Sequence, residues 1–196
     1  MKYIIMADGK GTRWNNHNNI PKHLIVIGGE TLLGRTVRLL NEMDPGCEVV
    51  ITSHDSRYEF PGARRHEPMN NNLEIDRFTT ELIEDQICFL YGDTYYHEHA
   101  IGEIINTPTE DMMFFGNERS IVAVKVADGN LFASHVENVR QLFLAGKIEK
   151  CIGWQVYQSF TGLPFGEKKI DKNFVILTDG TEDYNSPEDY DKRKNK

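Results

Sequence analysis

Residues 3–13 read YIIMADGKGTR, and residues 21–22 read PK. The apolar run at the start of this stretch has the length and β-branched content of a buried strand. Gly9 and Gly11 lack the Cβ atom that would keep a backbone from closing around an anionic ligand. Successive backbone N–H groups in such a loop form a nest for phosphate oxygens. The stretch therefore predicts a strand that ends in a phosphate-binding loop, and the alternative is a glycine-rich surface turn.

Two cations flank this loop and favour a triphosphate as the ligand. Arg13 adds a planar, two-pronged donor for phosphate oxygens, and Lys22 adds a compact positive charge. Two other phosphate motifs are excluded by the residues themselves. A P-loop requires Gly-x-x-x-x-Gly-Lys-Ser/Thr, which is absent, and a dinucleotide fingerprint requires a third glycine where the chain has Trp14.

The remaining pattern, Gly-x-Gly-Thr-Arg followed by Pro-Lys, resembles the nucleotidyltransferases. This family includes sugar-1-phosphate nucleotidyltransferases, the cytidylyltransferases for phosphocholine and methylerythritol phosphate, and molybdopterin guanylyltransferase. The positions that fit the family pattern are Ala7, Gly9, Gly11, Thr12, Arg13, Pro21 and Lys22. The resemblance implies that Arg13 and Lys22 are catalytic and that the whole loop binds the nucleotide through Ala7, Asp8, Gly9, Lys10, Gly11, Thr12, Arg13 and Lys22.

Asp8 departs from the family pattern, which has Ala or Gly at that position. A carboxylate beside a triphosphate should repel it. Three explanations stay open: Asp8 faces away, it lies near a bound cation, or it meets a positively charged acceptor.

A second motif follows the apolar strand predicted at residues 86–91, which runs directly into Gly92 and Asp93. Ligands of open α/β sheets lie outside the carboxyl ends of the strands, and a carboxylate there can hold a magnesium ion that bridges the triphosphate. The family carries an acidic residue after the same strand. The resemblance therefore implies that Asp93 contacts the nucleotide through Mg²⁺, and a simple Gly-Asp turn is the alternative.

The third motif lies near the C-terminus, where residues 185–189 read NSPED. Ser186 and Pro187 are typical of a helix start. The family closes with a similar string, whose first residue completes the metal site. The resemblance implies that Asn185 is a magnesium ligand, with help from Asp183.

Two weaker candidate sites depend on the phosphocholine enzymes alone. The resemblance implies that Asn71 and Asn72, at the end of a polar, irregular tract, lie near the nucleotide, although asparagine is equally common in turns. It also implies that Trp154 and Tyr157 bind the acceptor, because aromatic rings can hold a quaternary ammonium by cation–π attraction. Core packing is the alternative for these two aromatic residues.

The order of the predicted elements indicates an α/β protein. Strand, helix and strand in succession predict a parallel crossover. We expect a single-domain, Rossmann-like three-layer sandwich with a mixed, mainly parallel sheet, the GT-A-like nucleotidyltransferase fold, over residues 1–191, and a disordered basic tail at 192–196. The elements are expected as strands at 23–27, 48–52, 111–116, 120–126 and 173–178 and helices at 31–43, 73–84 and 130–145.

The composition limits the classes of partner. The chain has 196 residues, 39% of them hydrophobic, and a formal net charge of -8. That charge argues against sequence-independent nucleic-acid binding, which depends on many Lys and Arg contacts to phosphate. No apolar run approaches membrane-spanning length and the start of the chain lacks the features of a secretory signal, so we expect a cytoplasmic protein. A homodimer stays open.

Together the three motifs predict a Mg²⁺-dependent nucleotidyltransferase. Its partners would be a nucleoside triphosphate, by analogy CTP, and a phosphorylated small acceptor: phosphocholine, a phospho-amino acid such as phosphoglutamine, or a sugar or polyol phosphate destined for a surface polysaccharide. The products would be the nucleoside-diphosphate derivative and pyrophosphate. The alternatives are a nucleotide-sugar-dependent glycosyltransferase that uses Asp93, and a nucleotide-binding regulatory module that has lost catalysis.

Overall fold

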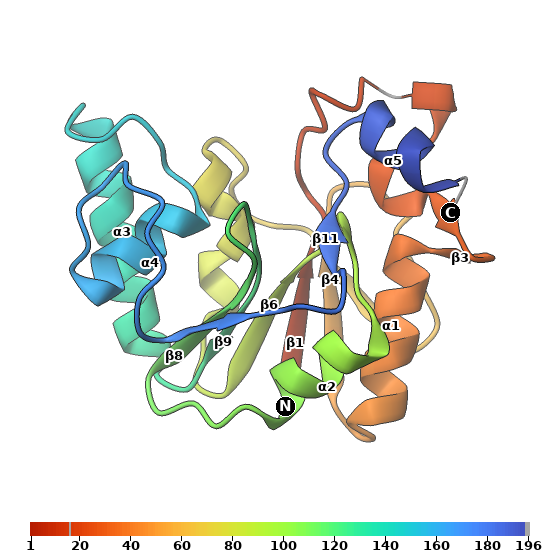
Figure 1. Cartoon of the computed structure of the whole chain (residues 1–196), viewed down its shortest axis with the longest axis horizontal. Coiled ribbons are helices and arrows are strands. Elements are labelled where there is room, and N and C mark those ends of the chain that lie inside the picture. The colour runs from red at the N-terminus through yellow and green to blue at the C-terminus, as the bar shows by residue number, and fades with distance from the viewer. Residues whose placement is uncertain (16, 195–196) are drawn as a thin grey trace.

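A computed structural model describes residues 1–15 and 17–194 of the chain. At its centre lies a seven-stranded sheet with the strand order β10-β8-β9-β6-β1-β4-β5 (Figure 1). The strands are β1 (Lys2–Met6), β4 (Glu48–Thr52), β5 (Arg64–His66), β6 (Ile87–Tyr91), β8 (Met112–Gly116), β9 (Ile121–Val126) and β10 (Phe174–Ile176). β1 pairs in parallel with both β4 and β6, and only β9 runs against its neighbours β6 and β8. The mixed, mainly parallel sheet predicted from the sequence is confirmed.

Helices cover both faces of this sheet. The helices are α1 (Leu32–Met43), α2 (Glu98–Asn106), α3 (Gly129–Leu144), α4 (Gly153–Thr161) and α5 (Pro187–Lys194). Along β1, Tyr3 and Ile5 belong to the core cluster under α1 and α2, whereas Ile4 and Met6 belong to the cluster under α3 and α4. This alternation follows from the two-residue period of a strand. Figure 1 shows the two helix layers on opposite sides of the sheet, which confirms the three-layer sandwich.

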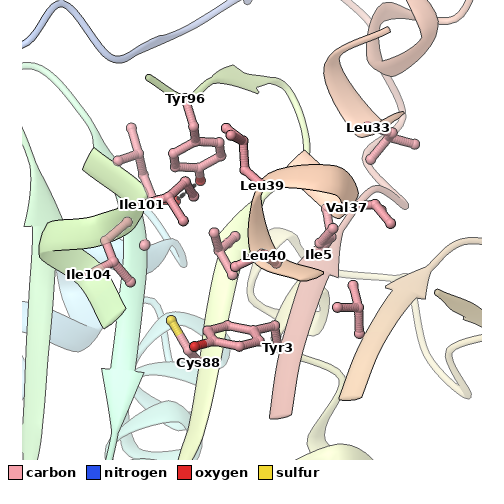
Figure 2. Packing of buried hydrophobic residues seen from close by; sticks show 14 of the residues in the cluster. Tyr3, Ile5, Leu33, Val37, Leu39, Leu40, Cys88, Tyr96, Ile101 and Ile104 are labelled. Carbon is pink, nitrogen blue, oxygen red and sulfur yellow. Dashed lines mark hydrogen bonds between the residues drawn. The ribbon is translucent and has the colours of Figure 1, made fainter. Parts of the chain in front are cut away.

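Helix α1 illustrates how the sequence builds one of these layers. The Thr31 side chain caps its first turn by accepting a hydrogen bond from the backbone N–H of Gly34 at 3.0 Å. Leu33, Val37 and Leu40 then recur at helical spacing and point at the sheet, as Figure 2 shows for the packing against the strand residues. The helix predicted at residues 31–43 is therefore confirmed.

Three predicted elements differ from the structure. Residues 23–27 are not one strand, because a 3₁₀ turn at Lys22–Leu24 precedes a two-residue strand, β2 (Val26–Ile27), which pairs with β3 (Glu30–Thr31). The helix predicted at 73–84 is two short 3₁₀ helices, Glu74–Phe78 and Thr80–Leu82. Thr79 between them has a φ of 45°, in the left-handed region, which ends the helical path. The polar tract before residue 72 contains β5, which extends the sheet beyond β4.

The C-terminal segment also differs from the prediction. After β10 the chain forms the two-residue strand β11 (Glu182–Asp183). This strand pairs antiparallel with β7 (Thr94–Tyr95). Helix α5 then runs to Lys194, so residues 192–194 are helical rather than a disordered tail, and the rest of that predicted tail lies outside the described residues. Among residues 1–15 and 17–194, no helix has both the length and the apolar character needed to cross a bilayer.

Candidate functional site

A buried ion pair joins the first two sequence motifs. β1 and β6 are neighbouring parallel strands, so their carboxyl ends meet, and the backbone N–H of Gly92 donates to the Met6 carbonyl at 3.0 Å. Asp93 follows Gly92, and its Oδ2 pairs with the Nζ of Lys22; each side chain is 9% exposed. Burial raises the pKa of Asp93, but the Lys22 ammonium outweighs it and holds that pKa below its usual range.

Gly92 is required for this approach. A Cβ atom at residue 92 would lie 2.8 Å from the Met6 carbonyl oxygen, 3.2 Å from the Ala7 Cβ and 3.3 Å from the His23 Cδ2. The first of these is a backbone atom that cannot move aside without shifting β1. The glycine therefore lets the chain after β6 turn across the end of β1 and place Asp93 beside Lys22.

His23 packs against the ion pair as a neutral ring. It is 3% exposed, and its Nδ1 lies 3.0 Å from the Tyr58 hydroxyl. Burial, and to a lesser extent the Lys22 charge, lowers the pKa of His23 to about 3. At neutral pH the ring carries no charge, so it does not compete with Lys22 for the Asp93 carboxylate.

The glycine-rich loop lies between an arginine and an aromatic anchor. A Cβ atom at Gly9 would lie 3.2 Å from Nη2 of Arg77, so the missing side chain lets a guanidinium lie against the loop. Arg77 comes from the 3₁₀ helix after the polar tract and has Glu74 as its ion-pair partner at 3.3 Å. At the other end, the buried Trp14 ring donates from Nε1 to the Ile20 carbonyl at 2.7 Å. The loop is thus held at both ends while Lys10, Thr12 and Arg13 remain exposed or partly so.

Asp8 faces away from the Lys22–Asp93 pair. Its carboxylate accepts hydrogen bonds from the backbone N–H of His54 at 2.9 Å and from Nδ2 of Asn71 at 2.8 Å. The same Nδ2 donates to the Asp8 backbone carbonyl at 2.8 Å. Asp8 therefore ties the glycine loop to the loops after β4 and β5, as the first of the three explanations predicts. Asn72 uses its backbone N–H to bind Asp76, and a nucleotide contact for Asn71 or Asn72 stays a prediction.

The C-terminal motif reaches the same edge of the sheet. Arg13 donates from Nη2 to Oδ1 of Asn185 at 2.8 Å, and Nδ2 of Asn185 donates to the Asp183 carboxylate. Asp183 stands opposite Thr94 in the β11–β7 ladder, and the backbone N–H of Tyr184 donates to the Asp93 carbonyl at 2.8 Å. Three motifs that are far apart in sequence are therefore neighbours in space.

These residues line a cavity of about 250 Å³. Its oxygen donors include Asp93, Asp183 and Asn185, the hard ligands that suit Mg²⁺. The described residues contain no cluster of three or more His, Cys, Asp or Glu side chains that could hold a metal by themselves. The donor set therefore fits a magnesium ion that takes most of its ligands from substrate phosphates and water, as Mg²⁺ commonly does.

The cavity also contains cations that the sequence analysis did not single out. Besides Arg13, its lining includes Arg77, Arg119, Lys150 and Lys168. No local motif marks these four residues, because Arg77 belongs to a 3₁₀ helix and the other three lie in separate loops, and only the fold brings them together. The only general expectation is that basic side chains outnumber acidic ones around a phosphate ligand, and this expectation does not identify particular residues in the sequence.

The two predicted acceptor residues are placed differently. Trp154, at the start of α4, lines the cavity and stacks on Phe174 with ring centroids 5.7 Å apart. Tyr157 is fully buried, and its hydroxyl binds the Asp171 backbone N–H at 2.7 Å and the Lys172 carbonyl at 3.1 Å. The contacts of Tyr157 are those of a core residue, which leaves Trp154 as the candidate for acceptor binding.

Comparison with known sequences gives one distant similarity. No family model matches the chain. The bifunctional protein GlmU of Francisella philomiragia is 24% identical over 120 residues, which cover 56% of this chain and 26% of the relative. The chain thus spans about a quarter of the length of the curated relative it matches.

Comparison with solved structures identifies the fold. The CTP:phosphocholine cytidylyltransferase LicC of Streptococcus pneumoniae aligns with a TM-score of 0.63 and 15% identity, covering 99% of this chain and 97% of LicC. The 4-diphosphocytidyl-2C-methyl-D-erythritol synthase of Anaerococcus prevotii gives 0.63 and 11%, with 99% and 94% covered. A UDP-glucose pyrophosphorylase complexed with UDP-glucose gives 0.65 and 12%, with 99% and 97% covered. The resemblance to nucleotidyltransferases is therefore confirmed at the level of the fold.

Proposed function

We propose that this chain transfers a nucleotidyl group from a nucleoside triphosphate to the phosphate of a small acceptor and releases pyrophosphate. The observation that carries the proposal is the buried Lys22–Asp93 pair beyond the carboxyl ends of β1 and β6, together with the hydrogen bond from Arg13 to Asn185. A structural role alone does not require an ion pair at the carboxyl edge of the sheet, beside an exposed loop with two glycines. The similarity in fold to three nucleotidyl-transferring or pyrophosphorylase structures supports the same reaction class.

In the proposed reaction an acceptor phosphate oxygen attacks the α-phosphorus in line. A new P–O bond forms, the bond from the α-phosphorus to the bridging oxygen breaks, and its electron pair leaves with pyrophosphate. No covalent enzyme intermediate is needed, so the protein contributes positioning and charge stabilisation. Lys22 would stabilise the charge that develops at the α-phosphate, with Asp93 fixing the position of its ammonium. Arg13 and the loop N–H groups would hold the β- and γ-phosphates.

Asp93, Asp183 and Asn185 are the residues that would hold magnesium. When bound, the ion would neutralise phosphate charge as the leaving group departs. The Arg13 bond to Asn185 couples this end of the site to the triphosphate loop, so we expect the C-terminal motif to adjust when the nucleotide enters. The base is proposed to be cytosine, because two of the similar structures are cytidylyltransferases.

The test is pyrophosphate release with Mg²⁺, crossing the four common nucleoside triphosphates with a panel of phosphorylated acceptors. Arg13→Gln should lower turnover by about 10²–10³-fold, as loss of a charge-stabilising donor does, and because Arg13 is exposed the variant should keep its fold. Arg64→Gln is the matched control, since Arg64 is half exposed on β5 and pairs with Glu48 away from the cavity. Triphosphate binding without turnover of any acceptor would favour the regulatory alternative, and transfer from a nucleotide-sugar would favour a glycosyltransferase.

A further inference from the structure

Three cations that line the cavity come from segments far in sequence from the glycine loop. Arg119 comes from the loop between β8 and β9, Lys150 precedes α4, and Lys168 follows it; all three line the cavity. Within residues 1–15 and 17–194, none of the three has an acidic side chain within ion-pair distance. Lys168 instead donates to the Arg119 carbonyl at 2.8 Å, which holds two of these charges together.

Two of the three acids in the same cavity are paired with cations, and the third, Asp183, accepts hydrogen bonds from neutral donors. Asp93 pairs with Lys22 and Glu74 with Arg77, and Asp183 accepts a hydrogen bond from the Ser120 hydroxyl at 3.1 Å. Arg119, Lys150 and Lys168 therefore add three positive charges to this cavity, in a chain whose net charge is -8, and the acid nearest to them in sequence that lines a cavity, Glu149, lines the neighbouring one. Cavities lined by one sign of charge concentrate ligands of the other sign.

Two buried polar atoms in α4 also lack partners among the described residues. Trp154 and Gln155 are each 6% exposed, and among the described residues neither Nε1 of Trp154 nor Oε1 of Gln155 has a hydrogen bond. A second cavity of about 560 Å³ adjoins the first and is lined by both residues. The two cavities share Lys150, Ile152, Trp154 and Lys168. A buried donor without a partner is unfavourable, so a ligand oxygen that accepted a hydrogen bond from the Trp154 Nε1 would stabilise the complex.

The surroundings of Trp154 are unsuited to a cationic acceptor. The Lys168 ammonium lies 5.7 Å from the centroid of the Trp154 ring, so this ring already has a cation over its face. A quaternary ammonium placed there would displace Lys168 or lie beside Lys150 and Lys168 with like charge. The structure therefore argues against phosphocholine as the acceptor.

We propose that the acceptor carries a second anionic group, a carboxylate or a further phosphate, which binds between Lys150 and Lys168 while an uncharged oxygen of the acceptor accepts the Trp154 N–H. This inference rests on the proposed function, since it assigns the substrate class of the same site. The acceptor's reacting phosphate faces Lys22, and its second anion faces away from the glycine loop, at the junction of the two cavities.

The test is equilibrium binding by titration calorimetry, in the presence of Mg²⁺ and a non-hydrolysable triphosphate analogue. The ligands are matched pairs: glucose 1-phosphate with glucuronic acid 1-phosphate, glycerol 3-phosphate with 3-phosphoglycerate, and phosphoethanolamine with phosphoserine. Glucose 1,6-bisphosphate separates a second phosphate from a carboxylate, and phosphocholine supplies a cation. In at least one pair the member with the extra anion should bind about five- to tenfold tighter, the size expected for two partly exposed charge pairs.

Two variants locate that preference. The double substitution Lys150→Gln and Lys168→Gln should abolish it and leave binding of the triphosphate analogue unchanged. Lys169→Gln is the matched control, because Lys169 is exposed next to Lys168 but lines neither cavity. Equal affinity within every pair, a preference that survives the double substitution, tighter binding of phosphocholine, or no saturable binding of any ligand would each overturn the assignment.

This test separates the two proposals. Preferred binding of the anionic members without pyrophosphate release from any triphosphate would retain the anion site and reject the transferase. Pyrophosphate release that favours the uncharged or cationic members would retain the transferase and reject the anion site.

Discussion

Removing the Lys22 ammonium tests the buried ion pair directly. Lys22→Met would leave the Asp93 carboxylate buried without its partner, since each side chain is only 9% exposed. Breaking a buried pair in this way costs about 3–5 kcal/mol of folding free energy. Adding Asp93→Asn to Lys22→Met removes the orphaned charge, so the double variant should recover about 1–3 kcal/mol of that loss. The measurement is urea denaturation of the wild type, both single variants and the double variant.

The pH dependence supplies an independent check on the same variant. In the wild type the pKa of Asp93 is held below its ordinary value of 3.8, so its contribution to stability is present above that pH and is lost as the pH falls through the lowered pKa. In Lys22→Met the Lys22 ammonium is gone, so burial, the largest influence on this group, raises the pKa of Asp93 against the weaker effect of the Arg77 charge. The folded variant then binds a proton more tightly than the unfolded chain, so its stability should rise as the pH falls.

The difference in unfolding free energy between wild type and Lys22→Met should therefore narrow between about pH 7 and about pH 4. Lys2→Met is the matched control, because Lys2 is at the opposite end of β1 and pairs there with Glu84 at 3.1 Å. Additive single-variant effects, or a pH-independent difference between wild type and Lys22→Met, would refute the claim that the pair is buried and coupled.

Further predictions concern the surroundings of the site. Gly92→Ala should destabilise the fold by about 1–3 kcal/mol and lower turnover, because its Cβ would lie 2.8 Å from the Met6 carbonyl oxygen; normal melting and turnover would contradict this close approach. Burial holds the pKa of His23 at about 3, below its ordinary value of 6.5. The free energy of unfolding should therefore decrease as the pH falls below about 6.5, by up to about 1.4 kcal/mol per pH unit. In His23→Gln the unfolding free energy, measured by denaturation at several pH values, should depend less steeply on pH. Gln155→Met replaces an unpartnered buried amide oxygen by a side chain of similar volume and should raise stability by about 1 kcal/mol, measured by thermal melting; a lower melting temperature would show that Oε1 is satisfied.

The sequence predicts which motifs lie close together in the fold only for those motifs that follow the ends of strands. Gly9 and Asp93 each follow a short apolar run, and the parallel pairing of such runs brings their carboxyl ends together. The arrangement of layers was predictable for the same reason, because strand and helix periodicity determine which residues face the core. The interrupted helix at residues 73–84 was not predictable from periodicity, since it depends on the left-handed backbone of Thr79.

The cations far in sequence from the glycine loop could not be predicted because no local pattern defines them. Arg119, Lys150 and Lys168 lie in three separate loops, and their proximity depends on where α4 and β9 pack. The orientation of Asp8 was likewise left open by the sequence, because it depends on two loops, at His54 and Asn71, whose positions follow from β4 and β5. Trp154 lines the cavity whereas the Tyr157 hydroxyl is hydrogen-bonded in the core, and this difference depends on how α4 packs against Phe174.

In the proposed reaction the α-phosphorus loses its bond to the bridging oxygen and gains a bond to the acceptor. The direct measurement uses two preparations of CTP, one radiolabelled in its α-phosphate and one in its γ-phosphate, incubated with the protein, Mg²⁺ and a mixture of phosphorylated acceptors. The α-label should enter an acceptor product and the γ-label should leave in pyrophosphate, with both signals greatly reduced in Arg13→Gln. Transfer of the γ-label to an acceptor, or release of the α-label as free nucleotide with no acceptor product, would contradict the proposed reaction.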